Sequence, residues 1–198
     1  MAHPDLTGIL LVGGASRRFG SPKALALLNG TTLAERAWET LGEACTARVA
    51  VGKLADGLEL PFPVLDDGTT TRAALTGVVA GLRASEKDLC AVLPVDTPLV
   101  TPQLLLELAD ACVDAAVTQT GPLPAAFRRR VLPVLERRLA DGSLALHDAL
   151  TELDTRRIDA DPALFANVNT PTDLYELERR TASASSSSSE PLRARPTR

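Results

Sequence analysis

Short apolar runs alternate with longer segments of helical period along most of this 198-residue chain. Each apolar run is rich in Val, Leu or Ala and is bounded by Gly, Pro or Asp, as is typical of buried strands. The predicted strands cover residues 6–12, 47–51, 63–65, 89–94 and 115–119. Strands that alternate with crossover helices favour a mostly parallel sheet with helices on both faces. We therefore expect an α/β fold consisting of one three-layer, Rossmann-like domain.

Helix start signals support this alternation. Thr32 and Glu35 have the spacing of a capping box, and Thr101 before Pro102 provides an N-cap followed by a first-turn proline. A similar start signal at Thr170 precedes the amphipathic segment "LYELERR". We expect helices to begin at these three places.

The size and composition indicate one folded unit. With 45% hydrophobic residues the chain can bury one sizeable core, and we assign it to residues 1–180. From residue 181 the sequence reads "TASASSSSSEPLRARPTR", which has too few apolar side chains to offset the entropy of ordering. We expect residues 181–198 to form a disordered tail.

The charge and the cysteines exclude several classes of protein. A net charge of −4 and 3% aromatic residues argue against a nucleic-acid surface, and no apolar run is long enough to predict a membrane span. Cys45, Cys90 and Cys112 are too widely spaced to indicate a zinc site or a disulfide framework. We expect a cytoplasmic protein that acts on small molecules.

The first strand leads into a loop suited to an anion. In "LLVGGASRRFGSPK" the backbone amides at Gly13 and Gly14 can approach a ligand closely, while Arg17 and Lys23 can reach different phosphates. A solvated surface turn is the alternative. The loop does not match the P-loop, because two residues separate its last glycine from Lys23, so a P-loop NTPase is disfavoured.

Polar side chains follow other predicted strands. Asp96 ends the apolar run "LCAVLPV", where a carboxylate would suit Mg²⁺ bound together with substrate phosphates, or would only shape the following turn. Asn167 and Asn169 flank one residue, so in an extended segment both amides point to the same side. They would hold a polar ligand or the turn before the last helix.

The pattern from Leu11 to Lys23 resembles the signature of nucleotidyltransferases that act on molybdopterin, and most of all the molybdenum cofactor guanylyltransferases. Three further motifs follow in that family's order: "VLDD" at 64–67, "LPVDTPLV" at 93–100 and "FANVNTPTDL" at 165–174. The resemblance implies the fold of nucleotide-diphospho-sugar transferases. It also implies transfer of GMP from GTP to molybdenum-molybdopterin, with Mg²⁺ as cofactor and release of pyrophosphate.

The resemblance also assigns roles to residues. Arg17 and Lys23 would be catalytic, and Asp96 would hold Mg²⁺. The nucleotide would contact Leu11, Gly13, Gly14, Lys23, Asp66 and Asp96, with Asp66 preferred to Asp67 by motif position. Asn167 and Asn169 would lie on the pterin side. GTP and molybdopterin would be the small-molecule substrates, with a transient contact to a molybdoenzyme or its chaperone.

Two departures from the family pattern keep alternatives open. After "VLDD" the family usually has Gly-Pro-Leu-x-Gly, whereas this chain keeps only Leu75 and Gly77 at that spacing and adds the cation Arg72. The segment "ADGSLALHDAL" lacks the basic residue that the family tends to place there. A cytidylyltransferase, a nucleotidyltransferase for another acceptor, or a non-catalytic nucleotide-binding partner protein are the alternatives.

Overall fold

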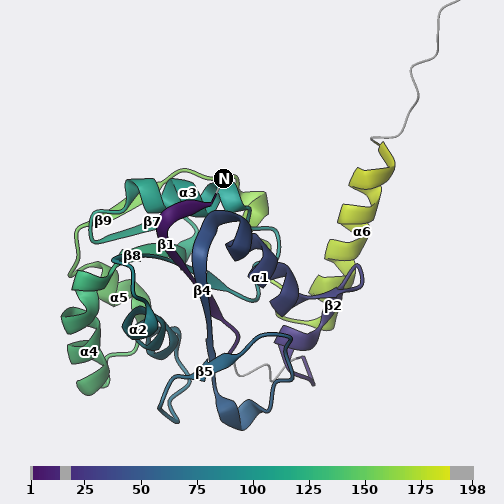
Figure 1. Ribbon diagram of the computed structural model, residues 1–198. Coiled ribbons are helices and arrows are strands. Elements are labelled where there is room, and N and C mark those ends of the chain that lie inside the picture. The colour runs from purple at the N-terminus through teal and green to yellow at the C-terminus, as the bar shows by residue number, and fades with distance from the viewer. Residues whose placement is uncertain (1, 14–18, 188–198) are drawn as a thin grey trace, which may run out of the picture.

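The computed structural model describes residues 2–13 and 19–187, with side chains described up to residue 181. A seven-stranded sheet in the order β5-β4-β1-β6-β8-β7-β9 crosses the middle of the domain (Figure 1). The adjacent strands β5, β4, β1 and β6 are parallel, whereas β8 runs antiparallel to both of its neighbours, β6 and β7. The mostly parallel sheet predicted from the sequence is therefore confirmed.

The strands of this sheet are short and mostly buried. Their bounds are β1 His3–Leu11, β4 Cys45–Gly52, β5 Val64–Asp66, β6 Leu89–Pro94, β7 Ala115–Thr118, β8 Gly121–Arg128 and β9 Thr155–Ile158. A separate two-stranded ribbon pairs β2 Leu27–Leu28 with β3 Thr31–Thr32. The five predicted strands all form, close to their predicted bounds.

Helices cover both faces of the sheet, which gives the three layers. They are α1 Leu33–Ala44, α2 Ala74–Ala84, α3 Pro102–Ala111, α4 Leu132–Ala140, α5 Leu146–Leu150 and α6 Pro171–Ser187. One buried cluster joins α1, α3 and the start of α6 to the sheet, and a second joins α2, α4 and α5 to the opposite face. None of the helices in the described residues is long and apolar enough to cross a membrane.

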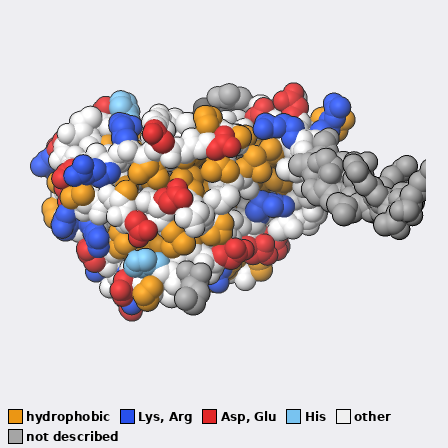
Figure 2. Space-filling model, turned by 90° about the horizontal axis from the view of Figure 1, so that it is seen from above, with side chains coloured by type: hydrophobic (Ala, Val, Ile, Leu, Met, Phe, Trp, Pro, Cys, Tyr) orange, Lys and Arg blue, Asp and Glu red, His pale blue; other side chains and the backbone are white. Residues whose placement is uncertain are grey.

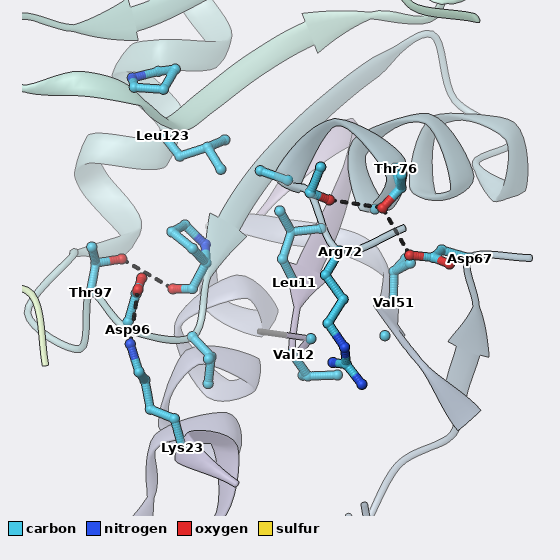
Figure 3. A pocket seen from close by; sticks show the side chains of 18 of the residues that line it. Leu11, Val12, Lys23, Val51, Asp67, Arg72, Thr76, Asp96, Thr97 and Leu123 are labelled. Carbon is cyan, nitrogen blue, oxygen red and sulfur yellow. Dashed lines mark hydrogen bonds and ion pairs between the residues drawn. The ribbon is translucent and has the colours of Figure 1, made fainter. Parts of the chain in front are cut away.

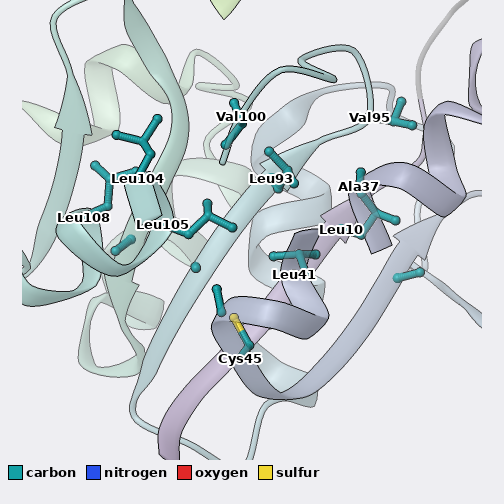
Figure 4. Packing of buried hydrophobic residues seen from close by; sticks show 14 of the residues in the cluster. Leu10, Ala37, Leu41, Cys45, Leu93, Val95, Val100, Leu104, Leu105 and Leu108 are labelled. Atoms are coloured by element: carbon teal, nitrogen blue, oxygen red, sulfur yellow. The ribbon is translucent and has the colours of Figure 1, made fainter. Parts of the chain in front are cut away.

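The first cluster illustrates how the two layers interlock. Leu10 and Leu93 project from neighbouring central strands toward Leu41 of α1 and Leu105 of α3, and all four are essentially inaccessible to solvent (Figure 4). Burial of a leucine side chain stabilises a fold by about 1.5–3 kcal/mol. The apolar runs recognised in the sequence therefore supply the centre of the core.

The predicted helix starts are confirmed. Thr32 and Glu35 form a reciprocal capping box at α1, and Thr101 accepts a hydrogen bond from the backbone of Leu104 at α3. At α6, Asp173 accepts hydrogen bonds from the backbone amides of residues 169 and 170. These caps fix the residue at which each helix begins. The last cap lies beside the carboxyl ends of the parallel strands.

The helix α6 overlaps the segment that we expect to be disordered. It continues to Ser187, and it contacts the β2–β3 ribbon through Asn29, whose backbone N–H donates to Glu178 and whose side chain donates to Thr181. The ribbon and α6 lie side by side in Figure 1. Residues 188–198 lie outside the described residues, so the disordered tail stays a prediction.

Figure 2 shows the face of the domain where β1 begins, opposite the carboxyl ends of the parallel strands. Lys and Arg side chains on this face are interspersed with Asp and Glu. Some neighbouring side chains of opposite charge form salt bridges; Arg130 Nε, for example, lies 2.7 Å from Asp114 Oδ1. Charges of both signs therefore alternate on this face.

Candidate active site

A cleft of about 660 Å³ opens at the carboxyl ends of the parallel strands. Its walls come from the ends of β1, β4 and β6, the start of α2, the turn between β7 and β8, and the segment before α6 (Figure 3). In open α/β sheets this edge is where ligands bind. The cleft is therefore the candidate active site.

Lys23 joins three distant parts of the chain on one side of the cleft. Its ammonium nitrogen Nζ lies 3.2 Å from Asp96 Oδ2 and donates to Asn169 Oδ1 at 2.8 Å. The Lys23 side chain is 13% exposed and that of Asp96 is 31% exposed, so both remain accessible from the cleft. The loop after β1, the end of β6 and the segment before α6 thus meet at the ammonium group of Lys23.

The segment that carries the two asparagines is anchored by its backbone. The N–H of Val168 donates to the carbonyl oxygen of Asp96 at 2.9 Å, and the Val168 side chain is buried in the core. Asn167 and Asn169, on either side of it, both line the cleft. The predicted one-sided orientation of the two amides is therefore confirmed.

The floor of the cleft is made largely of backbone. A Cβ atom added at Gly13 would lie 3.4 Å from the Cα atom of Gly52, and one at Gly52 would lie 2.8 Å from Val12 Cγ2. One at Gly77 would lie 2.9 Å from Leu11 Cδ2. Glycine at these places allows β1, β4 and α2 to approach closely and leaves room for a ligand.

A buried ion pair organises the other side of the cleft. Lys53 Nζ lies 2.6 Å from Asp67 Oδ1, and it also donates to the carbonyl oxygens of Thr69 and Thr71. The second carboxylate oxygen of Asp67 accepts a hydrogen bond from Thr76 Oγ1 at 2.9 Å. Lys53 thereby fixes the loop between β5 and α2.

Arg72 ends this loop and also lines the cleft. Its Nη1 and Nη2 atoms donate to the two carboxylate oxygens of Asp56, with Nη1 at 3.0 Å from Oδ2. This pairing lowers the pKa of the Asp56 carboxyl group and raises the pKa of Arg72. The guanidinium is therefore held in place at the rim while its side chain stays 42% exposed.

Asp66, the residue that we preferred for a nucleotide contact, is not among the residues that line the cleft. Its carboxylate accepts hydrogen bonds from the backbone N–H groups of Leu54 and Gly68, both at 2.7 Å, which lower its pKa. Neighbouring residues of an extended chain point to opposite sides, so Asp67 faces the cleft instead. Of these two neighbouring aspartates, Asp67 is the one that lines the cleft.

Of the other predicted site residues, some line the cleft and some lie outside the described residues. Leu11 and Gly13 line the cleft beside Lys23, as expected for residues that contact one ligand. Gly14 and Arg17 lie outside the described residues. Sequence reasoning assigned no ligand contact to residues 120–123, which include the start of β8 and line the cleft together with the asparagines.

A lysine beside the backbone of Gly13 suits the phosphates of a nucleotide, and the neighbouring carboxylate of Asp96 suits a divalent cation bound together with them. Fold and cleft together define a nucleotide-binding α/β domain. The sequence matches the family described as MobA-like NTP transferase domain over residues 8–157. The chain belongs to this family.

Similar proteins share nearly the full length of the chain. A probable molybdenum cofactor guanylyltransferase of Bacillus subtilis is 35% identical, with 88% of this chain and 96% of that protein covered. A molybdenum cofactor guanylyltransferase of Desulfosudis oleivorans is 30% identical, with coverage of 87% and 94%. The similarity therefore covers most of this chain and more than nine tenths of each relative.

Solved structures agree on the fold. Molybdopterin-guanine dinucleotide biosynthesis protein A of Archaeoglobus fulgidus superposes with a TM-score of 0.75 at 26% identity, over 89% of this chain and 99% of that chain. A 2-C-methyl-D-erythritol 4-phosphate cytidylyltransferase of Thermus thermophilus, at 18% identity, reaches 0.71 over 88% and 98%. The second match concerns the fold alone.

Proposed function

We propose that this protein transfers GMP from GTP to molybdenum-molybdopterin, forming a guanine dinucleotide cofactor and releasing pyrophosphate. The observation that carries the proposal is the convergence of Lys23, Asp96 and Asn169 at one side of the cleft. The activity named for relatives at 30–35% identity supports the choice of substrates.

The proposed reaction needs little covalent chemistry from the protein. The terminal phosphate oxygen of molybdopterin attacks the α-phosphorus of GTP and forms a new P–O bond. The bond between the α-phosphorus and the bridging oxygen breaks, and pyrophosphate leaves with the electron pair. An ionised phosphate is already a nucleophile, so catalysis consists of aligning two anions and stabilising the leaving charge.

Residues on the described walls can supply both effects. Lys23 would donate to the triphosphate, exchanging part of its contact with Asn169 for a phosphate oxygen. The backbone N–H of Gly13 lies at the start of the same loop. Arg17 would add a second cation, as the sequence predicts. The asparagines and residues 120–123, at the start of β8, form the remaining wall, which we assign to the pterin.

The donor set also suits Mg²⁺. Asp96 presents one carboxylate to the cleft, partly exposed and next to the proposed phosphate site. Mg²⁺ usually takes one or two carboxylates together with substrate phosphates, so Asp96 would hold it there. When bound, Mg²⁺ supplies charge neutralisation on the phosphates.

The decisive experiment incubates the purified chain with molybdenum-loaded molybdopterin and each Mg-nucleoside triphosphate in turn. Guanine dinucleotide and an equal amount of pyrophosphate are expected with GTP. A cytidine dinucleotide as the main product would replace the proposal with a cytidylyltransferase. Binding of GTP without pyrophosphate release would indicate a non-catalytic partner protein.

The Mg²⁺ assignment has its own test. Asp96→Asn keeps the shape of the side chain but removes the negative charge that the cation prefers. The variant should need much more Mg²⁺ for half-maximal pyrophosphate release, and its rate should fall. An unchanged Mg²⁺ midpoint would refute the assignment.

The cytoplasmic location and the contact with a molybdoenzyme or chaperone stay predictions.

A further inference from the structure

Arg72 lies on the side of the cleft opposite the proposed phosphate site. Figure 3 places its side chain with Asp67, Thr76 and Val51, whereas Lys23 and Asp96 lie on the other side. The proposed function assigns the triphosphate to Lys23 and so leaves the Arg72 side for the nucleoside. The inference below rests on that proposed function.

The guanidinium of Arg72 is anchored but not fully used. Arginine has five N–H donors. Nη1 and Nη2 donate to the two oxygens of Asp56 in the described structure. The Nε–H group and one outward N–H group on each Nη atom are not used in this pair. The Nε–H and the adjacent outward N–H form a second edge of the planar guanidinium, which can bind a ligand. Because Asp56 fixes the plane, this edge is preorganised for two acceptors that lie side by side.

The other polar side chains on this side are already engaged. The three N–H donors of the Lys53 ammonium are matched by Asp67 and two carbonyl oxygens. The single O–H proton of Thr76 is shared between Asp67 Oδ2 and the carbonyl oxygen of Ala73, which lie 2.9 and 2.8 Å from Thr76 Oγ1. Arg72 is therefore the described cation on this side that has donors left for a ligand.

The surface beside Arg72 is apolar. Leu11, Val12 and Val51 are at most 7% exposed and line the cleft together with the backbone of Gly52 and Gly77. Apolar walls with a few placed donors are typical of sites for heterocycles. A phosphate, in contrast, gains nothing from these walls.

We propose that Arg72 is the residue that selects guanine, donating from its open edge to O6 and N7 of the base. Guanine presents two neighbouring acceptors along this edge, and bidentate pairing with arginine is the commonest specific contact to it. Adenine has an amino donor in place of O6, and cytosine presents an amino donor as well. A guanidinium, which has no acceptor, discriminates against both.

This assignment explains how the chain can select its base without the proline-containing turn of its relatives. Lys53 holds the loop backbone at Thr69 and Thr71, and Asp56 holds the side chain at its end. In this chain the loop between β5 and α2 therefore offers the base two fixed N–H donors of Arg72, where the family pattern has a proline-containing turn. Arg72 is then a specificity-determining residue, and the phosphate chemistry remains with Lys23.

The test measures binding of Mg-GTP, Mg-ITP, Mg-7-deaza-GTP and Mg-CTP to the full chain and to Arg72→Met, by titration calorimetry. ITP keeps O6 and N7, whereas 7-deaza-GTP lacks the N7 acceptor. A good bidentate pair discriminates by about 1–3 kcal/mol, so Arg72→Met should weaken GTP and ITP about 5- to 150-fold. CTP should be affected much less. The preference for GTP over 7-deaza-GTP should disappear in the variant.

Arg83→Met is the matched control, because it removes one exposed arginine from the far end of α2, the helix that follows Arg72, and gives the same change in net charge. It should leave all four affinities unchanged, and melting curves should establish that both variants fold. Equal weakening of all four nucleotides by Arg72→Met would assign Arg72 to the phosphates and overturn the proposal. Unchanged GTP binding would overturn it too.

The design separates this inference from the proposed function. If the wild-type chain forms guanine dinucleotide but Arg72→Met keeps the preference for GTP over 7-deaza-GTP, only the role of Arg72 fails. If the wild-type chain prefers CTP in both binding and product formation, the proposed function fails and the role of Arg72 fails with it.

Discussion

Lys23 Nζ donates to Asn169 Oδ1 at 2.8 Å, although the two residues are 146 positions apart in the sequence. The same ammonium lies 3.2 Å from Asp96, whose backbone carbonyl accepts the N–H of Val168. The first and last motifs of the chain are therefore tied together across the end of β6. A ligand phosphate that binds Lys23 would compete with both partners.

Replacement of Lys23 by alanine should greatly slow catalysis and leave the fold intact. The lysine provides charge at the phosphate site, and loss of one preorganised charge stabiliser costs about 10²–10³ in rate. Pyrophosphate release and melting temperature should be measured together. Lys87→Ala is the control, since Lys87 makes an exposed ion pair with Asp5 at 3.7 Å. A wild-type rate in Lys23→Ala would refute the phosphate site.

Asp173 should give stability that depends on pH. Its carboxylate accepts the N–H groups of Asn169 and Thr170, both at 2.8 Å, and the bond from Asn169 is the main cause of its lowered pKa. A carboxyl group whose pKa is lowered by folding stabilises the fold above its unfolded pKa of about 3.9. This contribution is lost as the pH falls through the lowered folded value.

The corresponding experiment compares melting temperatures of the wild type and Asp173→Ala from pH 7 to pH 2. The wild type should be more stable by a constant amount near neutral pH, and the difference should shrink below about pH 4. Asp173→Asn keeps an acceptor for the helix start without a titrating charge. A difference between wild type and Asp173→Ala that persists unchanged to pH 2 would contradict this role.

Most of the fold could be predicted because the central strands are apolar and the helices carry caps. The strand β8 is absent from the strands predicted by apolar pattern, since Pro122 and Pro124 stand near its start and proline normally argues against a central strand. The strand β9 has the sequence "TRRI", in which Arg156 and Arg157 are exposed at the edge of the sheet. An edge strand needs little apolar surface, so its pattern is weak.

The candidate site, like the fold, could be predicted from the sequence only in part. Lys23, Asp96 and Asn169 could be found because each follows a strand or precedes a helix with a recognisable motif. The partners of Lys53 and Arg72 lie 14 and 16 residues away, respectively, and these contacts depend on how the loop after β5 folds back onto β4. No local pattern predicts them. Arg72 was visible in the sequence only as an unusual cation.

The three cysteines should not react in the folded protein. Burial raises the pKa of Cys45 to about 12 and those of Cys90 and Cys112 to about 11, so all three are thiols at pH 8. They are also at most 6% exposed. A thiol-reactive disulfide reagent should label them only as fast as the protein unfolds. Rapid labelling without denaturant would contradict the burial of these side chains.

The buried pair of Lys53 and Asp67 should be the most sensitive point of the cleft wall. Their side chains are 9% and 6% exposed. Removal of one partner leaves a buried charge without compensation, which typically destabilises a protein by about 3–5 kcal/mol. Lys53→Met should therefore lower the free energy of unfolding by about that amount, as measured by urea denaturation.

A double-mutant cycle separates this pair from simple loss of packing. Asp67→Asn removes the carboxylate charge, so adding it to Lys53→Met should cost less than the sum of the two single changes. We expect a coupling energy of at least about 1 kcal/mol, because directly paired charges are not additive. Additive effects would mean that Lys53 acts through its bonds to the Thr69 and Thr71 carbonyls instead.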